Sequence, residues 1–463
     1  MIDLKNIAGI YFVGIGGIGM SALALYFVRG GYAVAGFDRS ESSITSSLSG
    51  QGCDVSNDDR VDTIPIFFRD ISVKSKVLVV YTPAIPSGNL ILSYFRGNGY
   101  RLVKRAEVLG EISLHTDTLA VAGTHGKTTI STMIAHLLKQ SHIDCSAFLG
   151  GISKNYNSNL LLGNSRYTII EADEFDRSFH WLSPLMAVVT SMDADHLDIY
   201  GTHGTMVEAY NVFCGKVRKG GILVVNSRVR RDIVIPAGVT CFTYGSEPES
   251  DFHAFDIEHH NDYYKFSIRT PDTTIGDLHF TYPGIINIEN ITAASAIALM
   301  CGVTEQELRK GIMLFQGVRR RFDIRVNIPG LAYVDDYAHH PEEINACIRS
   351  LREFFRDRRI TGIFQPHLFS RTRDHAVGFA GILDELDEII LLPVYPAREL
   401  PIEGVSSELI FNKMKSKNKR LLDKEDIPGK LDIPNIDVLV TIGAGDIDTL
   451  VGPIEEILKK VRI

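Results

Sequence analysis

The segment at 121–129 holds the residues whose types and spacing indicate chemistry most clearly. It reads Val-Ala-Gly-Thr-His-Gly-Lys-Thr-Thr, follows an apolar run at 119–122 and precedes a helical pattern at 130–138. A glycine-rich turn between a strand and a helix presents backbone N–H groups and the helix dipole to an anion, and a lysine adds a point charge. A threonine hydroxyl at the helix start can bind Mg²⁺. The segment therefore predicts a site for the phosphates of ATP or GTP, formed by Gly123, Thr124, His125, Gly126, Lys127, Thr128 and Thr129.

Two further polar residues follow apolar, β-branched runs downstream of this turn. Glu171 comes after the run at 167–170, and His196 follows the run at 186–190. Because neighbouring strands of a parallel sheet end at one edge, both side chains are expected beside Thr128 and the phosphates. Mg²⁺ prefers oxygen ligands, so Thr128 and Glu171 suit a first ion, and a histidine suggests a second, less demanding site. The remaining acids of these loops are expected to cap, support or face solvent: Asp173, Glu174, Asp176, Asp193, Asp195 and Asp198.

A second glycine-rich turn lies near the N-terminus. A short strand at 9–13 precedes Gly14-Ile-Gly16-Gly17-Ile-Gly19, an apolar helix at 20–28 follows, and a strand at 33–37 ends in Asp38. A G-x-G-x-x-G turn with an acid after the next strand is typical of dinucleotide-binding β-α-β units. Taken alone, this segment leaves three readings open: NAD binding, binding of another nucleotide, and a packing turn without a ligand.

The elements that must position these residues form three blocks. Apolar β-branched runs alternate with helical patterns, which predicts parallel sheets with ligands at the carboxyl ends of the strands. The architecture is α/β, with three domains in series: a Rossmann-like domain at 1–105, a central P-loop domain at 106–318 with a small antiparallel annex at 240–281, and a Rossmann-like domain at 319–463. Further strands are expected at 64–68, 77–80, 222–225, 332–335, 360–364, 388–392 and 437–441, and a helix at 288–300.

Composition bounds the class of protein. The 463 residues are 45% hydrophobic and 22% charged, as expected for globular domains. A net charge of -8 argues against non-specific binding of nucleic acid. The six cysteines are scattered without a C-x-x-C pair, which indicates reduced thiols. The first residues lack a basic segment followed by an apolar stretch, and no apolar run reaches about 18 residues, so we expect a cytoplasmic protein without membrane insertion.

Taken in order along the chain, these motifs resemble the Mur ligase family, which forms amide bonds in the cytoplasmic assembly of peptidoglycan. The short phosphate loop is similar to that family's G-T-x-G-K-T-[TS], and the first glycine-rich turn is similar to a loop that holds the diphosphate of a UDP-sugar. The resemblance runs from about Gly14 to Gly445. It implies an ATP- and Mg²⁺-dependent ligase that joins L-alanine to the lactyl carboxylate of UDP-N-acetylmuramate through an acyl phosphate, releasing ADP and phosphate.

The resemblance also implies roles for individual residues. It implies a UDP-sugar site at Gly14, Gly16, Gly17, Gly19, Asp38, Thr82 and Asn89. It implies ATP contacts from Asn287, Asn290, Arg321 and Asp336, and an amino-acid site at Tyr337, His339, His367 and Arg371. It implies catalytic roles for Lys127, Glu171, His196 and His339, and metal ligands at Thr128, Glu171 and His196. The sequence departs from the family pattern at Ile286, where a histidine is usual, and at Leu368, where an arginine is frequent.

Other functions remain open at this point. A ligase of the same family could attach a peptide or another amino acid to UDP-N-acetylmuramate in cell-wall recycling. An NAD-dependent oxidoreductase built on the first turn would leave the phosphate loop, Glu171 and His196 without a role. A P-loop switch with slow ATPase activity would hydrolyse ATP without any acceptor. We expect the chain to act as a monomer or weak homodimer.

Overall fold

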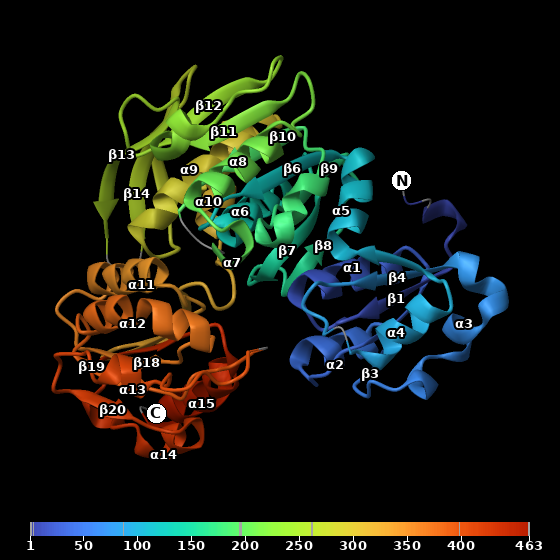
Figure 1. The fold of residues 1–463 in the computed structure, drawn as a ribbon. Helices are drawn as coiled ribbons and strands as arrows, with labels where there is room; N and C mark the ends of the chain where they lie inside the picture. The colour runs from blue at the N-terminus through green and yellow to red at the C-terminus, as the bar shows by residue number, and fades with distance from the viewer. Residues whose placement is uncertain are drawn as a thin grey trace. The chain divides into compact units, whose positions relative to one another are not determined.

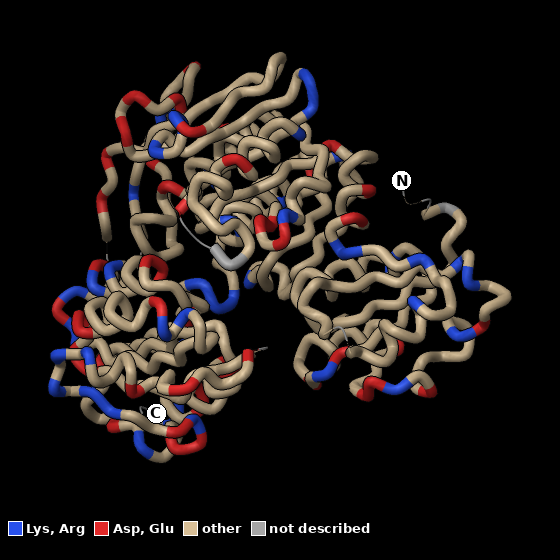
Figure 2. Tube along the Cα trace, viewed as in Figure 1, with Lys and Arg blue, Asp and Glu red and all other residues tan. Residues whose placement is uncertain are grey.

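The computed structural model describes residues 2, 4–86, 88–193, 197–260, 263–397 and 399–461. The chain divides into two compact units. The first comprises residues 1–260, 264–281 and 289–316, and the second comprises 261–263, 282–288 and 317–463. The first unit contains two sheets and the second contains one (Figure 1). Basic and acidic residues are interspersed along both units (Figure 2).

The N-terminal sheet is parallel throughout. Its spatial order is β3 (Asp54–Ser56), β2 (Ala33–Phe37), β1 (Gly9–Val13), β4 (Val77–Tyr81) and β5 (Arg101–Lys104). The strand order reverses beside β1, and such a switch point is where open α/β sheets bind ligands at their carboxyl edge. The helices around it are η1 (Leu4–Asn6), α1 (Ile18–Arg29), α2 (Ser43–Gly50), η2 (Val61–Thr63), α3 (Ile66–Arg69), η3 (Ile71–Lys76), α4 (Leu90–Gly97) and α5 (Arg105–Leu114), where η marks a 3-10 helix.

One strand prediction in this region is wrong. The run at 64–68 forms the single helical turn α3, not a strand. Pro65 stands at its N-cap with φ −57° and ψ 147°, the non-helical backbone that precedes a helix start. Phe68 is buried while Ile66 is 79% exposed, so the apolar residues serve one packed side of a turn.

The second sheet of the first unit has ten strands. Their order is β15 (Thr274–Phe280), β14 (Tyr264–Arg269), β13 (Phe252–His259), β12 (Thr240–Gly245), β11 (Ile222–Asn226), β10 (Met186–Val189), β6 (Asp117–Ala122), β9 (Tyr167–Glu171), β7 (Ser146–Ser153) and β8 (Ser158–Leu161). β6 lies between β10 and β9 and pairs parallel with both, so their polar ends share one edge, which the sequence predicted. The surrounding helices are α6 (Lys127–Lys139), η4 (Phe175–Trp181), α7 (Leu197–Tyr200), α8 (His203–Cys214), η5 (Ser227–Asp232), α9 (Ile285–Met300) and α10 (Glu305–Leu314).

The antiparallel annex continues this sheet. β13, β14 and β15 pair antiparallel, as expected for this region. β12 pairs parallel with β11, so the first strand of the annex extends the parallel part. One hydrophobic core joins both sheets of the first unit, for example where Tyr26 of α1 packs on Phe148 of β7 with ring centroids 5.3 Å apart.

The second unit is built on a six-stranded sheet. Its order is β16 (Asp323–Ile328), β17 (Leu331–Asp336), β21 (Val438–Ile442), β18 (Ile360–Phe364), β19 (Glu388–Leu391) and β20 (Lys419–Leu421). Only the β16–β17 pair is antiparallel. The helices are α11 (Pro341–Phe354), α12 (Phe369–Leu383), α13 (Glu408–Phe411), η6 (Lys424–Asp426), α14 (Ile427–Lys430), η7 (Ile433–Asn435), η8 (Asp446–Leu450) and α15 (Val451–Val461).

The three-sheet α/β architecture therefore matches the expected fold class. The domain boundaries at 105 and 318 stay predictions. All six cysteines are free thiols, and five of them are buried. Among the described residues, none of the helices has the length and apolar character required to cross a bilayer.

Candidate active site

The phosphate loop connects β6 to α6 at the switch point of the ten-stranded sheet. Gly123 has φ +139°, and a side chain there would overlap Thr190, so only glycine fits. Thr190 Oγ1 donates to the carbonyl of His125 (2.5 Å), and the His125 N–H donates to Ser191 Oγ (3.0 Å). The residues after β10 thus fix the backbone of the loop.

Lys127 lies in this loop and is held by a carboxylate. Its Nζ lies 2.8 Å from both carboxylate oxygens of Glu174 and donates to the carbonyl of Gly123 (2.6 Å). Burial opposes the charge of the lysine, but the carboxylates of Glu174 and Glu171 outweigh it, so the pKa of Lys127 lies above its usual value. Lys127 is therefore a charged ammonium at the place where the phosphates would bind.

Glu174 itself lies in a strained loop. Two and three positions later, Asp176 and Arg177 have φ of 53° and 55°. This left-handed conformation is costly for residues with a side chain. Tyr200 OH donates to the carbonyl of Glu174 (2.5 Å), and Lys104 pairs with Asp176 (2.7 Å). The Tyr200 contact fixes the backbone at Glu174, whose carboxylate is only 3% exposed and lies against Lys127.

Thr128 and Glu171 come together as the sequence predicted. Thr128 Oγ1 donates to Glu171 Oε1 (3.1 Å), and the Gly150 N–H donates to Oε2 (3.1 Å). A hydroxyl and a carboxylate beside a phosphate loop are the hard oxygen ligands that Mg²⁺ requires, so this pair fits that ion. The third predicted ligand, His196, lies outside the described residues.

The two predicted adenine-contacting asparagines differ in their surroundings. Asn290 belongs to the first unit, where its Oδ1 lies beside Gly126 of the phosphate loop. Asn287 belongs to the second unit, where its Nδ2 donates to the carbonyl of Pro283 (2.5 Å). Asn290 is therefore placed against the loop, whereas Asn287 also serves the start of α9.

The first glycine-rich turn has a different set of partners. The Gly16 N–H donates to Asp38 Oδ2 (2.7 Å), and a side chain at Gly14 would meet Thr82 (3.2 Å). The structure thus brings Asp38 and Thr82 to the turn at the carboxyl ends of β2 and β4. Asn89 is buried and caps α4, since its Oδ1 accepts the Leu92 N–H (2.8 Å), which gives it a structural role.

In the second unit, Asp336 organises the loop that carries Arg321. Its two carboxylate oxygens accept the N–H groups of Phe322 (2.6 Å) and Ala338 (2.8 Å). Tyr282 OH donates to the carbonyl of Arg321, and the Arg321 guanidinium lies 5.1 Å from the ring centroid of Tyr337. Asp336 therefore fixes the backbone on either side of its own strand end, next to Arg321.

The four residues of the predicted amino-acid site form one cluster. The rings of Tyr337 and His339 lie 5.4 Å apart between centroids, those of His339 and His367 lie 5.9 Å apart, and Arg371 Nη1 donates to His367 Nδ1 (3.3 Å). Tyr395, which the sequence did not indicate, stacks on His367 at 5.8 Å. The cluster lies at the carboxyl edge of the sheet and combines a cation with aromatic and imidazole groups.

The imidazole of His339 is buried, and one of its nitrogens faces a carbonyl. Burial holds the pKa of its imidazole below the usual value. Its Nδ1 lies 3.0 Å from the carbonyl of Tyr337, which can only accept a hydrogen bond, so Nδ1 carries the proton and Nε2 is the basic nitrogen.

Leu368 replaces the arginine that is frequent in the family and has an unusual backbone. Its φ is +71°, and its N–H donates to the carbonyl of Tyr395 (2.9 Å). This conformation is strained for leucine, and the contact fixes the segment that carries His367.

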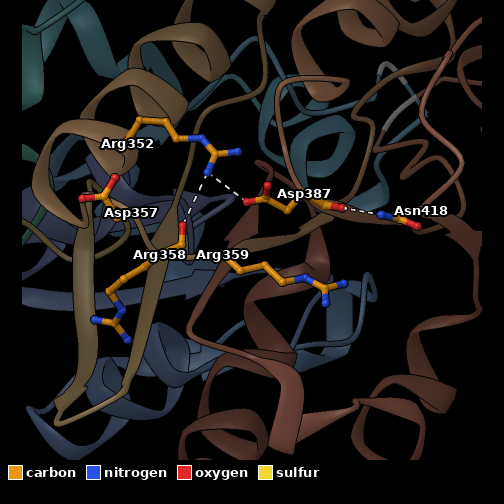
Figure 3. A pocket seen from close by; sticks show the side chains of 6 residues that line it. All are labelled: Arg352, Asp357, Arg358, Arg359, Asp387 and Asn418. Atoms are coloured by element: carbon orange, nitrogen blue, oxygen red, sulfur yellow. Dashed lines mark hydrogen bonds and ion pairs between the residues drawn. The ribbon is translucent and has the colours of Figure 1, made fainter.

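A separate cavity of about 510 Å³ lies at the amino edge of the six-stranded sheet, opposite the predicted amino-acid site (Figure 3). Arg352 donates to Asp387 (2.9 Å), and Arg359 pairs with Glu388 (3.1 Å). Two of its arginines are thus paired with carboxylates, and it contains none of the predicted site residues. Its lining residues are Arg352, Asp357, Arg358, Arg359, Asp387 and Asn418.

Sequence reasoning missed several residues of the site. Glu174 was expected only to support or face solvent, although the acidic run around it was a signal that it faces a cation. Ser191, Gly150, Arg105 and Tyr395 gave no local signal, because their contacts join segments that are distant in sequence.

These features define an α/β protein of the nucleotide-binding class, with a P-loop and a second glycine-rich turn in the same unit. Family comparisons agree with that class. The Mur ligase family, catalytic domain matches residues 9–116, the Mur ligase middle domain matches 121–298, and the Mur ligase, glutamate ligase domain matches 320–445. The chain belongs to the Mur ligase family.

Individual relatives are similar over their whole length. The UDP-N-acetylmuramate–L-alanine ligase of Parabacteroides distasonis is 47% identical over 100% of both chains. The enzyme of that name from Porphyromonas gingivalis is 48% identical over 97% of this chain and 99% of its own. The crystal structure of the UDP-N-acetylmuramate–alanine ligase of Thermotoga maritima superposes with a TM-score of 0.83 at 25% identity, covering 98% of this chain and 100% of that one.

Proposed function

We propose that the chain is an ATP-dependent ligase that joins L-alanine to the lactyl carboxylate of UDP-N-acetylmuramate, releasing ADP and phosphate. The observation that carries the proposal is the group of Lys127, Thr128 and Glu171 at the switch point of a P-loop sheet. A cavity of about 300 Å³ is lined both by Glu171 of this group and by the first glycine-rich turn. The full-length relatives at 47–48% identity are L-alanine ligases by name, which supports the choice of acceptor.

In the first step, a lactyl carboxylate oxygen attacks the γ-phosphorus of ATP. The bond to the β–γ bridging oxygen breaks, and ADP leaves with that electron pair, giving an acyl phosphate. Lys127 neutralises charge on the transferring phosphoryl group, and the N-terminus of α6 presents N–H groups to the phosphates. Mg²⁺, when bound by Thr128 and Glu171, would stabilise the same charge. Positioning and electrostatics supply the acceleration.

In the second step, the amine of L-alanine attacks the acyl carbon. The tetrahedral intermediate collapses with loss of phosphate, and the proton of the nitrogen passes to a base. His339 is the proposed base, because its Nε2 is unprotonated and burial keeps the imidazole neutral. Arg371 is the proposed partner of the alanine carboxylate, since a guanidinium fits a carboxylate with two parallel hydrogen bonds.

The proposal carries several finer expectations. The adenine would contact Asn290, which lies beside the phosphate loop. His196 would complete the metal site with Thr128 and Glu171. Because ATP and UDP-sugars are cytoplasmic metabolites, the reaction would take place in the cytoplasm. A monomer or weak homodimer would suffice, since the described groups all come from one chain.

The test is phosphate release from ATP with UDP-N-acetylmuramate, screened across amino acids and short peptides. We expect release to require all three substrates and to be fastest with L-alanine. Release that no amino acid or peptide changes would refute the ligase. A preference for a peptide acceptor would instead indicate a recycling enzyme.

A further inference from the structure

The cavity of about 300 Å³ in the first unit runs from the first glycine-rich turn to residues of β7 and β9 in the ten-stranded sheet. One end is formed by residues 17–20 at the start of α1, together with Thr82 after β4. The other end is formed by Gly150 and Glu171 of the ten-stranded sheet. A molecule that fills the cavity therefore contacts the first turn and reaches the carboxylate of the proposed metal site.

Arg105, the first residue of α5, contributes a cation to this cavity. Its side chain is 20% exposed, and Nη2 lies 3.2 Å from Asp173 Oδ2. A methyl group at Gly19 would lie 3.1 Å from Cζ of Arg105 and closer still to Nη1. The guanidinium therefore lies directly against the first turn of α1, and glycine at position 19 makes room for it.

The charge balance of the first turn requires such a group. The segment at 14–21 contains neither lysine nor arginine, and the Asp38 carboxylate occupies the Gly16 N–H. Among the described residues that line the cavity, Arg105 is the one Lys or Arg. A diphosphate brings two negative charges into this partly buried space, where an unpaired charge is costly.

We propose that Arg105 binds the diphosphate of the UDP-sugar and that Asp173 is its positioning carboxylate. The inference rests on the proposed function, in which the first turn holds that nucleotide. Arg105 has five N–H donors, so the contact with Asp173 fixes the plane of the guanidinium while other donors face the cavity. Each turn then has one cation that is paired with a carboxylate. At the second turn this is Lys127 with Glu174, and at the first it is Arg105 of α5 with Asp173.

The experiment is titration calorimetry of the full chain with UDP, UDP-N-acetylglucosamine and UDP-N-acetylmuramate. UDP-N-acetylglucosamine keeps the diphosphate and lacks the lactyl carboxylate. We expect Arg105→Ala to weaken all three ligands by a similar factor, roughly ten- to hundredfold, as for loss of a hydrogen bond between charged groups. The affinity of Arg105→Lys for these ligands should lie between those of the wild type and Arg105→Ala, because lysine keeps the charge and loses the planar fork.

Lys104→Ala is the matched control. Lys104 is the neighbouring cation, pairs with Asp176 and does not line the cavity. The Lys104→Ala variant should therefore bind the uridine nucleotides like the wild type. Binding of a non-hydrolysable ATP analogue should survive in all variants and reports the fold. If Arg105→Ala loses the analogue, Arg105→Lys carries the same comparison.

Two results would overturn the inference. Unchanged binding of all three ligands by Arg105→Ala would mean that Arg105 has only a structural role, through its ion pair with Asp173. A loss confined to UDP-N-acetylmuramate would assign Arg105 to the lactyl carboxylate instead. Failure of the wild type to bind any of the three uridine nucleotides would refute the proposed function itself, which separates the two claims.

Discussion

The two glycine-rich turns of the first unit have the same local design and different sources of charge. Both follow a buried parallel strand at a switch point and begin a helix, β1 to α1 and β6 to α6. The second turn carries its own cation, Lys127, three residues after Thr124. The first turn carries none, and the charged groups beside it are Asp38, which follows β2, and Arg105, which begins α5.

This difference shows which part of an anion site a local motif can encode. Backbone N–H groups and the helix dipole follow from the turn alone. The charge balance does not, because it depends on which distant side chains the fold brings to the turn. In the second turn that balance includes the buried carboxylate of Glu174, and in the first it includes Arg105 with Asp173.

Lys127→Ala is expected to give the largest effect and separates the two turns most strongly. Loss of a charge partner in the transition state costs about 10²- to 10³-fold in kcat. Binding of UDP-N-acetylmuramate should stay near the wild-type value, because the first turn does not use Lys127. Phosphate-release kinetics and calorimetry measure the two quantities, and a variant that lost both would contradict the separation.

Thr128→Ala and Glu171→Ala should each raise the Mg²⁺ concentration for half-maximal activity by at least about tenfold. The reason is that the two oxygens lie 3.1 Å apart beside the phosphate loop. Thr128→Ser is the control, since it keeps the hydroxyl. Magnesium titrations of activity that coincide for wild type and both alanine variants would move the metal elsewhere.

Much of the fold could be predicted from the sequence, for a physical reason. Strands such as β1, β2 and β18 are buried on both faces, so they read as continuous apolar runs between turns, and their predicted bounds agree with the structure. The short strands β3, β5, β8 and β20 lie at sheet edges and carry polar residues, so no run marked them. The error at α3 arose because a single turn with a few apolar residues has no measurable period.

The site divides along the same line. Lys127, Thr128 and Glu171 were predictable because each stands next to a strand end that the sequence marks. The contacts of Lys127 with Glu174 and of Gly19 with Arg105 were not, because they form between segments joined only by the folded chain. The predicted amino-acid site is intermediate between the predictable and the unpredictable contacts. Its four residues were named from the family resemblance, and the structure adds Tyr395 and the strained Leu368.

Glu174→Gln tests whether the carboxylate is part of the second turn's charge balance. Removing a charge from a buried pair leaves Lys127 without its counterion, and we expect a loss of about 1–3 kcal/mol in unfolding free energy without nucleotide. Saturating ATP analogue should recover part of the loss, because its phosphates supply negative charge to Lys127. Thermal unfolding with and without the analogue measures this difference.

The contrary outcome for Glu174→Gln is equally specific. An identical loss in the presence and absence of the ATP analogue would mean that Glu174 stabilises its strained loop and not the charge on Lys127. Asp176→Asn is a suitable comparison, since Asp176 lies in the same loop and pairs with Lys104, not with Lys127. Its deficit should not respond to the analogue.

Gly19→Ala should give the smallest effect and sharpens the comparison for the first turn. Gly19 lies within α1, where alanine is favoured over glycine by about 1 kcal/mol, so the helix itself should tolerate the change. The added methyl group must push the Arg105 guanidinium aside, and because that group ends a flexible side chain the displacement is cheap. We therefore expect UDP binding to weaken only severalfold, through the altered position of Arg105.

In the Arg105→Ala background the methyl group meets no guanidinium, and the second substitution should cause no further loss. A double-mutant cycle by calorimetry measures this coupling, which should fall in the range of about 0.5–3 kcal/mol found for residues in contact. Additive effects of the two substitutions would mean that Gly19 and Arg105 serve the first turn independently.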